Sequence, residues 1–204
     1  MTYKLTVSDE WNSIKDSRDL WVYNKLELSQ VLGYKCGPAG LPVPEPGFYI
    51  ARPIINFMGM GRYSRIEHIE GCTEHLHPGE FWCEVFEGEH ISVDFRYGKP
   101  DLIVRGDRDP HDPLYRWSHW ERVDRDVKFP HELLEFLHKY KWINCEFIGD
   151  KLIEVHFRRN PDFRYGNSKA TPIWHDDEIP NIPIDSPLSY IGDDDYYRKG
   201  FIIN

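Results

Sequence analysis

Over residues 81–86 and 90–95 the odd-numbered residues are apolar, and the polar residues Glu84, His90, Ser92 and Asp94 are all even-numbered. This period of two is typical of a strand that packs one face on a core and turns the other outward. Glu87 and Gly88 separate the two segments, as expected of a hairpin turn. The pattern therefore predicts a β-hairpin over residues 81–97. The polar face of that hairpin consists of Glu84, His90, Ser92 and Asp94.

A second β-hairpin is predicted further along the chain, with strands at residues 142–148 and 152–157. Gly149 and Asp150 between them are typical turn residues. Residues directly opposite each other in such a pair lie about 4.5–5.5 Å apart, so polar side chains on one face can meet. The period of two gives that face Glu146 from the first strand and Glu154, His156 and Arg158 from the second.

Two segments carry apolar residues at helical spacing. Residues 16–32 are predicted to form one amphipathic helix that ends at Gly33. Its apolar face consists of Leu20, Tyr23, Leu26 and Val31. Residues 130–140 begin with Pro130, which suits the first position of a helix. The apolar face of this second helix consists of Leu133, Leu134 and Leu137.

The remaining segments are dominated by Pro and Gly or by β-branched residues. Residues 36–47 hold four prolines and three glycines, which predicts an extended linker. Residues 48–56 predict a buried strand interrupted by Pro53. The chain from residue 160 onward predicts an irregular wrap that reaches the acidic run 193–195. Together these elements predict an α+β fold of two helices and mostly antiparallel strands.

Composition narrows the class of protein. A chain of 204 residues suits one large domain or two small lobes that share a cleft. The formal net charge of −9 argues against nucleic-acid binding, which favours a basic surface. No apolar run reaches the length of a signal peptide or a membrane span, so neither a membrane nor export is expected. Four cysteines without a C-x-x-C pair are then expected to be reduced thiols in the cytoplasm.

The second hairpin is the first candidate for chemistry. Two carboxylates held close together repel each other unless a cation lies between them. Mg²⁺ accepts one or two protein carboxylates when nucleotide phosphates complete its coordination shell. Glu146 and Glu154 therefore suggest a magnesium site with His156 beside it. The alternative is that these residues are solvated on the outer face of a two-layer sheet.

Arg52 is the second candidate, because it interrupts an otherwise apolar strand. An unpaired buried guanidinium is costly, so Arg52 requires a carboxylate partner or a phosphate. Gly59 and Gly61 follow shortly after it. Glycines allow backbone N–H groups to approach an anion closely.

A zinc site is a third candidate, formed by Cys72, His75, His77 and Cys83. These residue types are common zinc ligands, although the spacing matches no common structural zinc motif. The alternative is a turn at His77 that leads into a strand with Cys83 in the core. The sequence contains no G-x-S-x-G elbow, Walker A loop or Rossmann fingerprint.

Four short motifs in order resemble those of the ATP-grasp superfamily, over about residues 24–160. The first is Asn24-Lys25, then a helix ending near Gly33, then residues 41–44 (LPVP). The others are residues 49–53 with the glycines after them, residues 81–94, and residues 146–156 with Arg158. They resemble the phosphate-binding strand and its flap, the adenine-binding hinge strand, and the metal-binding hairpin. Small phage-encoded ATP-grasp-like proteins are the most similar in appearance.

The resemblance implies an ATP-grasp-like α+β fold, in which two small lobes of mostly antiparallel sheet plus helices surround a nucleotide cleft. Lobe one would cover residues 36–80 and lobe two residues 81–160, with a wrapping tail over 161–204. It also implies a ligase that uses ATP and Mg²⁺ to join a carboxylate to an amine or thiol through an acyl phosphate. The substrates would be small molecules or peptides, and the location the cytoplasm, that of the host if the chain is phage-encoded.

The resemblance further assigns roles to individual residues. Arg52 would bind phosphate and take part in catalysis, and Gly59 and Gly61 would cover the phosphates. Glu84 and Glu87 would meet the adenine and ribose. The metal ligands would be Glu146, Glu154 and His156, and Arg158 would face the phosphate or acyl phosphate.

Three residues depart from the family pattern. Arg52 replaces a Lys, His156 replaces an Asn, and His90 replaces a Glu. Most of the usual N-terminal domain is also missing. Two alternatives therefore stay open: a ligase, with a homodimer as one way to complete its acceptor pocket, or a nucleotide-binding or protein-interaction module without turnover.

Overall fold

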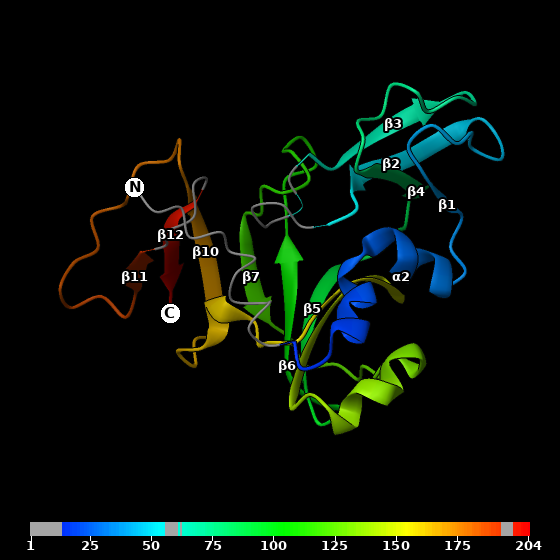
Figure 1. The fold of residues 1–204 in the computed structure, drawn as a ribbon. Helices are drawn as coiled ribbons and strands as arrows, with labels where there is room; N and C mark the ends of the chain where they lie inside the picture. Colours follow the sequence, from blue (N-terminus) through cyan, green and yellow to red (C-terminus); the bar gives the residue numbers. More distant parts are fainter. Residues whose placement is uncertain (1–13, 56–60, 62, 193–197) are drawn as a thin grey trace.

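The computed structural model describes residues 14–55, 61, 63–192 and 198–204, which fold into two β-sheets with short helices (Figure 1). The helical segments are η1 (Ser17–Tyr23), α2 (Lys25–Val31), η2 (His131–His138) and η3 (Pro161–Phe163), of which only α2 is an α-helix and the others are 3₁₀ helices. The strands of the small sheet are β1 (Cys36–Pro38), β2 (Gly47–Pro53), β3 (Arg65–Ile69) and β4 (Glu80–Glu84). Those of the large sheet are β5 (His90–Arg96), β6 (Lys99–Asp107), β7 (His119–Arg122), β8 (Trp142–Ile148), β9 (Lys151–His156), β10 (Lys169–Trp174), β11 (Ser189–Gly192) and β12 (Arg198–Ile203).

Every described strand pairing is antiparallel. The four-stranded sheet has the order β1-β4-β2-β3, and the eight-stranded sheet has the order β11-β12-β10-β7-β6-β5-β8-β9. The predicted α+β class, with two mostly antiparallel sheets and few helices, is confirmed. None of the helices in the described part of the chain is long and apolar enough to span a membrane.

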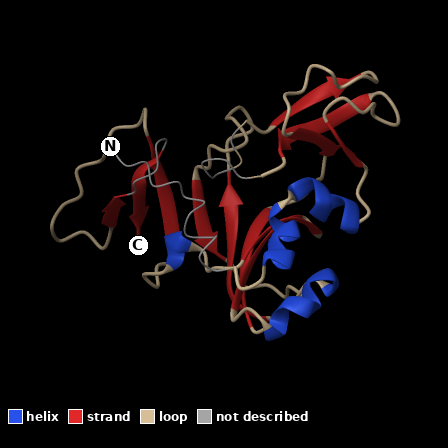
Figure 2. Ribbon diagram, viewed as in Figure 1, coloured by secondary structure: helices blue, strands red, loops and turns tan. Residues whose placement is uncertain are grey.

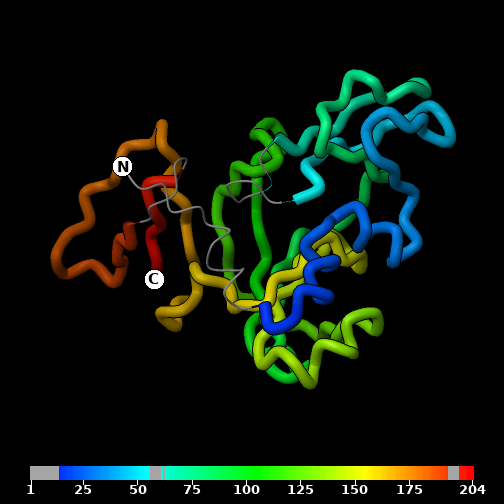
Figure 3. Tube along the Cα trace, in the orientation of Figure 1, coloured from blue at the N-terminus to red at the C-terminus, as the bar shows by residue number. Residues whose placement is uncertain are grey.

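The predicted hairpin over residues 81–97 is wrong. β4 pairs with β1 and β2, whereas β5 pairs with β6 and β8, so the two strands belong to different sheets. Residues 85–89 lead the chain from the small sheet into the large one (Figure 3). The real turn partner of β5 is β6. Tyr97 and Gly98 between them have φ values of 49° and 76°, and positive φ at both residues is what a type I′ hairpin turn requires.

The second predicted hairpin is confirmed as β8–β9, with Gly149 at a φ of 60° in its turn. The expectation of an irregular tail is wrong, because β10, β11 and β12 extend the large sheet. The linker predicted for residues 36–47 contains the short strand β1. The acidic run 193–195 lies outside the described residues.

The single helix predicted over residues 16–32 is instead two segments, η1 and α2. Asn24 separates them with φ −84° and ψ 97°, and its side-chain oxygen accepts a hydrogen bond from the Glu27 backbone N–H at 3.0 Å. This is an N-cap, which starts a new helix in a new direction. The predicted apolar face is also wrong: Val31 is 54% exposed, while Val22 and Leu28 are buried. Gly33 follows α2 with a φ of 73°, as a helix stop should.

The helix predicted over residues 130–140 is the 3₁₀ segment η2, and Pro130 precedes it rather than starting it. Leu133 and Phe136 are buried, whereas Leu134 is exposed. With three residues per turn, a 3₁₀ helix aligns positions i and i+3, which explains why Phe136 takes the place predicted for Leu134.

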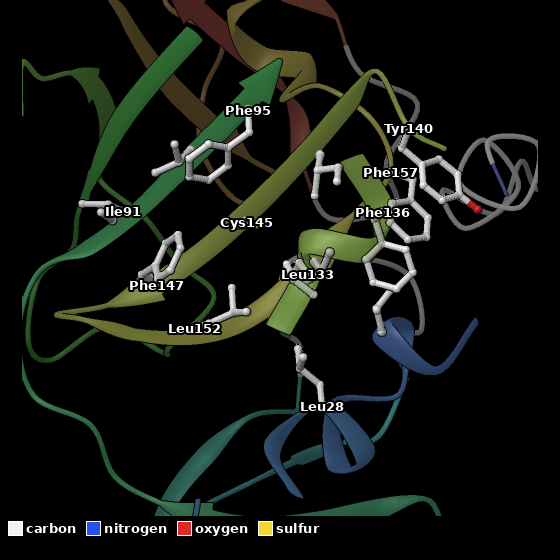
Figure 4. Close-up of a cluster of buried hydrophobic side chains, with 14 residues drawn as sticks. Leu28, Ile91, Phe95, Leu133, Phe136, Tyr140, Cys145, Phe147, Leu152 and Phe157 are labelled. Atoms are coloured by element: carbon white, nitrogen blue, oxygen red, sulfur yellow. The ribbon is translucent and has the colours of Figure 1, made fainter. Parts of the chain in front are cut away.

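The main core lies between the large sheet and the helices at its β5–β8–β9 end (Figure 2). Alternate residues of the three strands, such as Ile91, Cys145 and Leu152, face the helical residues Leu28, Leu133 and Phe136 (Figure 4). A second cluster around Tyr49 and Trp82 supports the small sheet. Because the helices cover one face of β5, β8 and β9, the polar residues of those strands are directed to the opposite face.

Candidate functional site

The face of β5, β8 and β9 opposite the core carries rows of polar residues. Ser92, Glu146 and Glu154 are direct neighbours across the three strands. Asp94, Asn144 and His156 form the next row. Most of these side chains are buried, although they lie on the face turned away from the apolar core. A solvated outer face, the alternative considered from the sequence, does not fit this burial.

The two carboxylates of the β8–β9 hairpin each contact a histidine. Glu146 Oε2 lies 3.1 Å from Nε2 of His90, and Glu154 Oε1 lies 3.1 Å from Nε2 of His156. Two further rings support His90, since those of Trp117 and Trp120 lie edge-on to it with centroids 4.7 and 5.3 Å away. The cross-strand pairing of Glu146 with Glu154 agrees with the hairpin predicted from the sequence.

Lys25 is a residue of this cluster that the sequence did not single out as a site residue. It is the first residue of α2, it is buried, and its Nζ lies 2.9 Å from Glu154 Oε2. Burial of Glu154 opposes its ionisation, but the charge of Lys25 and the hydrogen bond from His156 outweigh that effect and hold the pKa of Glu154 below its usual value. In the sequence, Lys25 stands out only as part of the Asn24-Lys25 motif.

Arg52 reaches the same cluster from β2 of the small sheet. Its Nη2 donates to the Ile153 carbonyl oxygen at 3.4 Å, and its guanidinium lies 5.1 Å from the Phe81 ring centroid. The side chain is buried, and its Nε has no hydrogen-bond acceptor among the described residues. Burial lowers the pKa of Arg52, although the charges of Glu154 and Glu146 oppose that shift. Arg52 therefore connects the small sheet to the backbone of β9, one residue before Glu154.

Asp94 organises the far end of the polar face. Its Oδ1 accepts hydrogen bonds from Asn144 Nδ2 at 2.9 Å and from the Asn160 backbone N–H at 2.9 Å. Burial raises the pKa of Asp94 in spite of these donors. The bond to Asn160 fixes the chain just after β9, where Arg158 lies half-buried and electrostatically coupled to Asp94.

Glu84, Glu87, Gly59 and Gly61 are the remaining predicted site residues. Glu84, at the end of β4, accepts a hydrogen bond from the Lys35 backbone N–H at 2.8 Å and lines a cavity of about 220 Å³ with Lys35 and Tyr49. Glu87 is exposed between the two sheets. Gly61 is half-buried with a φ of 63°, and Gly59 lies outside the described residues.

Metal binding by protein side chains alone is not indicated. Within the described ranges, no three or more His, Cys, Asp or Glu side chains are grouped so that they could hold a metal ion. The zinc candidate is therefore unsupported, and its Cys83 is buried on β4 while Cys72 is exposed. Glu146 and Glu154 could supply part of a magnesium shell, provided that a ligand supplies the rest.

Comparison with known proteins gives similarity at the level of the fold. The sequence matches no protein-family model and no curated protein. Among solved structures, a candidate ATP-grasp superfamily protein from Archaeoglobus fulgidus is similar with a TM-score of 0.49 and 14% identity, over 90% of this chain and 64% of that one.

Two structures of the ATP-grasp ligase PsnB are similar to a lesser degree. The complex with a minimal precursor has a TM-score of 0.45 and 15% identity, over 71% of this chain and 54% of that one. The complex with a phosphomimetic variant of the precursor, Mg and ADP has a TM-score of 0.45 and 14% identity, over 72% and 53%. This chain thus spans between about half and two thirds of the chains it resembles.

Proposed function

We propose that this protein binds ATP with Mg²⁺ beside Arg52 and the Glu146–Glu154 pair, and that it acts as an ATP-grasp-type ligase. The ligase would join a carboxylate to an amine or thiol through an acyl phosphate. The observation that carries the proposal is Arg52, a buried guanidinium whose Nε has no acceptor among the described residues. Arg52 belongs to the small sheet and contacts the β8–β9 hairpin. In the described part of the large sheet, this is the only hairpin in which two carboxylates are direct cross-strand partners.

The chemistry of Arg52 favours a phosphate over a neutral ligand. A buried, unsatisfied donor on a charged group costs more than one on a neutral group. The Nε and one Nη of a guanidinium form a fork that matches two oxygens of a phosphate. The nearest carboxylates do not use this fork, because Glu154 and Glu146 are bonded to Lys25 and to histidines.

Lys25 provides a second cation at Glu154, and its backbone N–H donates to the Ile54 carbonyl oxygen, just after β2, at 2.8 Å. A phosphate near Arg52 would give Lys25 an alternative partner and would release Glu154. Glu146 and Glu154 would then hold Mg²⁺ together with phosphate oxygens, and the ion would neutralise charge on the transferred phosphoryl group. Arg158, which lies just after β9 and lowers the pKa of Asp94 through its charge, would stabilise negative charge on an acyl phosphate.

The second candidate is a nucleotide-binding or protein-interaction module without turnover. It is favoured by the present contacts of the carboxylates, since Glu154 contacts Lys25 and His156 while Glu146 contacts His90. Carboxylates that already have these partners are less available to a metal ion.

Nucleotide binding is tested by thermal unfolding with MgATP. A ligand at 100 times its Kd stabilises the folded state by about 2.7 kcal/mol. We expect Arg52→Met to lose this stabilisation and Arg52→Lys, which restores a cation, to keep part of it. Arg125→Gln is the matched control, because Arg125 is an exposed arginine bonded to Glu89. Equal stabilisation of the wild type and Arg52→Met, or none for the wild type, contradicts the proposal.

Turnover separates the two candidates. With a panel of carboxylic acids and hydroxylamine as the trapping nucleophile, a ligase forms ADP and a hydroxamate, because hydroxylamine attacks acyl phosphates. Binding of MgATP without ADP formation across the panel favours the module without turnover.

A further inference from the structure

Two of the four free cysteines lie directly opposite each other in the small sheet. Cys36 on β1 and Cys83 on β4 are Cα partners in the antiparallel register. Partners in such a pair point to the same side of the sheet. The other two cysteines lie elsewhere, with Cys72 exposed and Cys145 buried in β8.

The hydrogen bonds around this pair define its geometry. The Glu84 backbone N–H donates to the Lys35 carbonyl at 2.9 Å, and the Ala39 N–H donates to the Glu80 carbonyl at 3.2 Å. Lys35–Glu84 and Ala39–Glu80 are therefore hydrogen-bonded pairs. In an antiparallel ladder, such pairs alternate with pairs that share no backbone hydrogen bond. The cysteines, one residue inward from Lys35 and Glu84, therefore occupy a non-hydrogen-bonded pair.

The spacing of such a pair permits a disulfide. Directly opposite residues that do not share backbone hydrogen bonds have Cα atoms about 4.5 Å apart, closer than the hydrogen-bonded kind. Disulfides span Cα separations of about 4.4–6.8 Å, so the pair lies at the short end of this range. A bond can therefore form between the two thiols without a large displacement of either strand.

The two thiols differ in access and lie near the candidate site. Cys83 is fully buried and interacts electrostatically with Arg52, while Cys36 is partly exposed. Reagents in solution therefore reach Cys36 first, and Cys83 is the group placed to react with any adduct on it.

We propose that Cys36 and Cys83 are a site of reversible oxidation, at which a low-molecular-weight disulfide such as glutathione disulfide closes a bond between β1 and β4. The Cys36 thiolate attacks one sulfur of glutathione disulfide and releases one glutathione. The Cys83 thiolate then attacks the Cys36 sulfur and releases the second glutathione. The protein loses two protons and two electrons, and glutathione disulfide takes up both to become two molecules of reduced glutathione.

The rate of closure depends on pH. Burial raises the pKa of Cys36 and raises the pKa of Cys83 to about 12. Because the thiolate is the attacking species, closure accelerates as the pH rises toward these values.

The experiment treats the reduced full-length protein with glutathione disulfide and maps the products by mass spectrometry. We expect the number of free thiols to fall from four to two, with Cys36 and Cys83 joined in one cross-linked peptide. Reduced glutathione in excess should restore all four. Cys72→Ser is the matched control and should close normally, whereas Cys36→Ser should show no intramolecular bond. The wild-type map decides the outcome even if a Cys83 variant does not fold.

Three results would overturn the proposal. They are retention of all four thiols under conditions that oxidise the denatured protein, a glutathione adduct confined to Cys72, or a disulfide that includes Cys72 or Cys145. The affinity for MgATP of the closed and open forms is a separate measurement, and only this consequence rests on the proposed function. If neither form binds MgATP, the nucleotide site fails while the oxidation site stands.

Discussion

Replacing Lys25 with Met tests whether the buried Lys25–Glu154 pair supports the fold as well as the site. Lys25 is 4% exposed and Glu154 is 9% exposed, with 2.9 Å between Nζ and Oε2. Removing one partner of a buried ion pair leaves an uncompensated charge and costs about 3–5 kcal/mol. A domain of this kind has a total stability of about 5–15 kcal/mol, so the loss is a large share of it.

Thermal denaturation followed by circular dichroism measures the effect. Each kcal/mol shifts the Tm of a protein of this length by about 2–4 °C, so Lys25→Met should lower the Tm by about 6–20 °C. The double variant Lys25→Met with Glu154→Gln should recover part of the loss, because it removes both charges together. Lys151→Gln, at the exposed first residue of β9, serves as the control.

The pH dependence provides a second readout. The pKa of folded Glu154 lies below its ordinary value of 4.5. Its ionisation therefore contributes stability that is present above 4.5 and is lost as the pH falls toward the folded value. The difference between wild type and Lys25→Met should be largest at neutral pH and should shrink in acid. A cost below about 1 kcal/mol, with a double variant that loses the sum of both single changes, would refute this reasoning.

Three further predictions, made with four substitutions, test the packing. Gly106→Ala places a methyl group 2.8 Å from Trp117, and such overpacking should cost about 1–3 kcal/mol in urea denaturation. Phe136→Ala should cost about 3–5 kcal/mol, whereas Leu134→Ala on the exposed side of η2 should stay within about 0.5 kcal/mol; equal effects would contradict the observed face of η2. Gly149 has a φ of 60°, and an alanine there would place its methyl group 2.7 Å from the Glu87 backbone oxygen. Differential scanning calorimetry should therefore show a loss of stability of about 1–3 kcal/mol for Gly149→Ala.

The two predicted hairpins show which structural features the period of two determines and which it does not. β8 and β9 are joined by a short turn and pair with each other, so the period of two correctly placed Glu146 opposite Glu154. β4 and β5 show the same period, but β4 pairs with strands earlier in the chain and β5 with strands later. The period fixes which face a residue occupies and leaves its partner undetermined.

In the cluster around Arg52, one buried charged residue could be predicted from the sequence and another could not. A charged residue in an apolar strand predicts a buried functional group, and Arg52 is buried against β9. Lys25 carried no such signal, because a lysine in the first turn of a short helix is normally solvated. Its burial depends on the packing of α2 against β9, which the local sequence does not encode.

The two candidate functions differ in whether Glu154 keeps its present contacts when the nucleotide binds. Glu154 can bind a metal ion only if Lys25 or His156 gives up its contact, and a phosphate beside Arg52 offers Lys25 another partner. In a working ligase, magnesium and nucleotide should therefore strengthen each other's binding, and this coupling is necessarily reciprocal. In a module whose carboxylates stay bonded to these side chains, nucleotide affinity should not depend on magnesium. Titrating ATP by calorimetry with and without Mg²⁺ distinguishes these cases before any substrate is known.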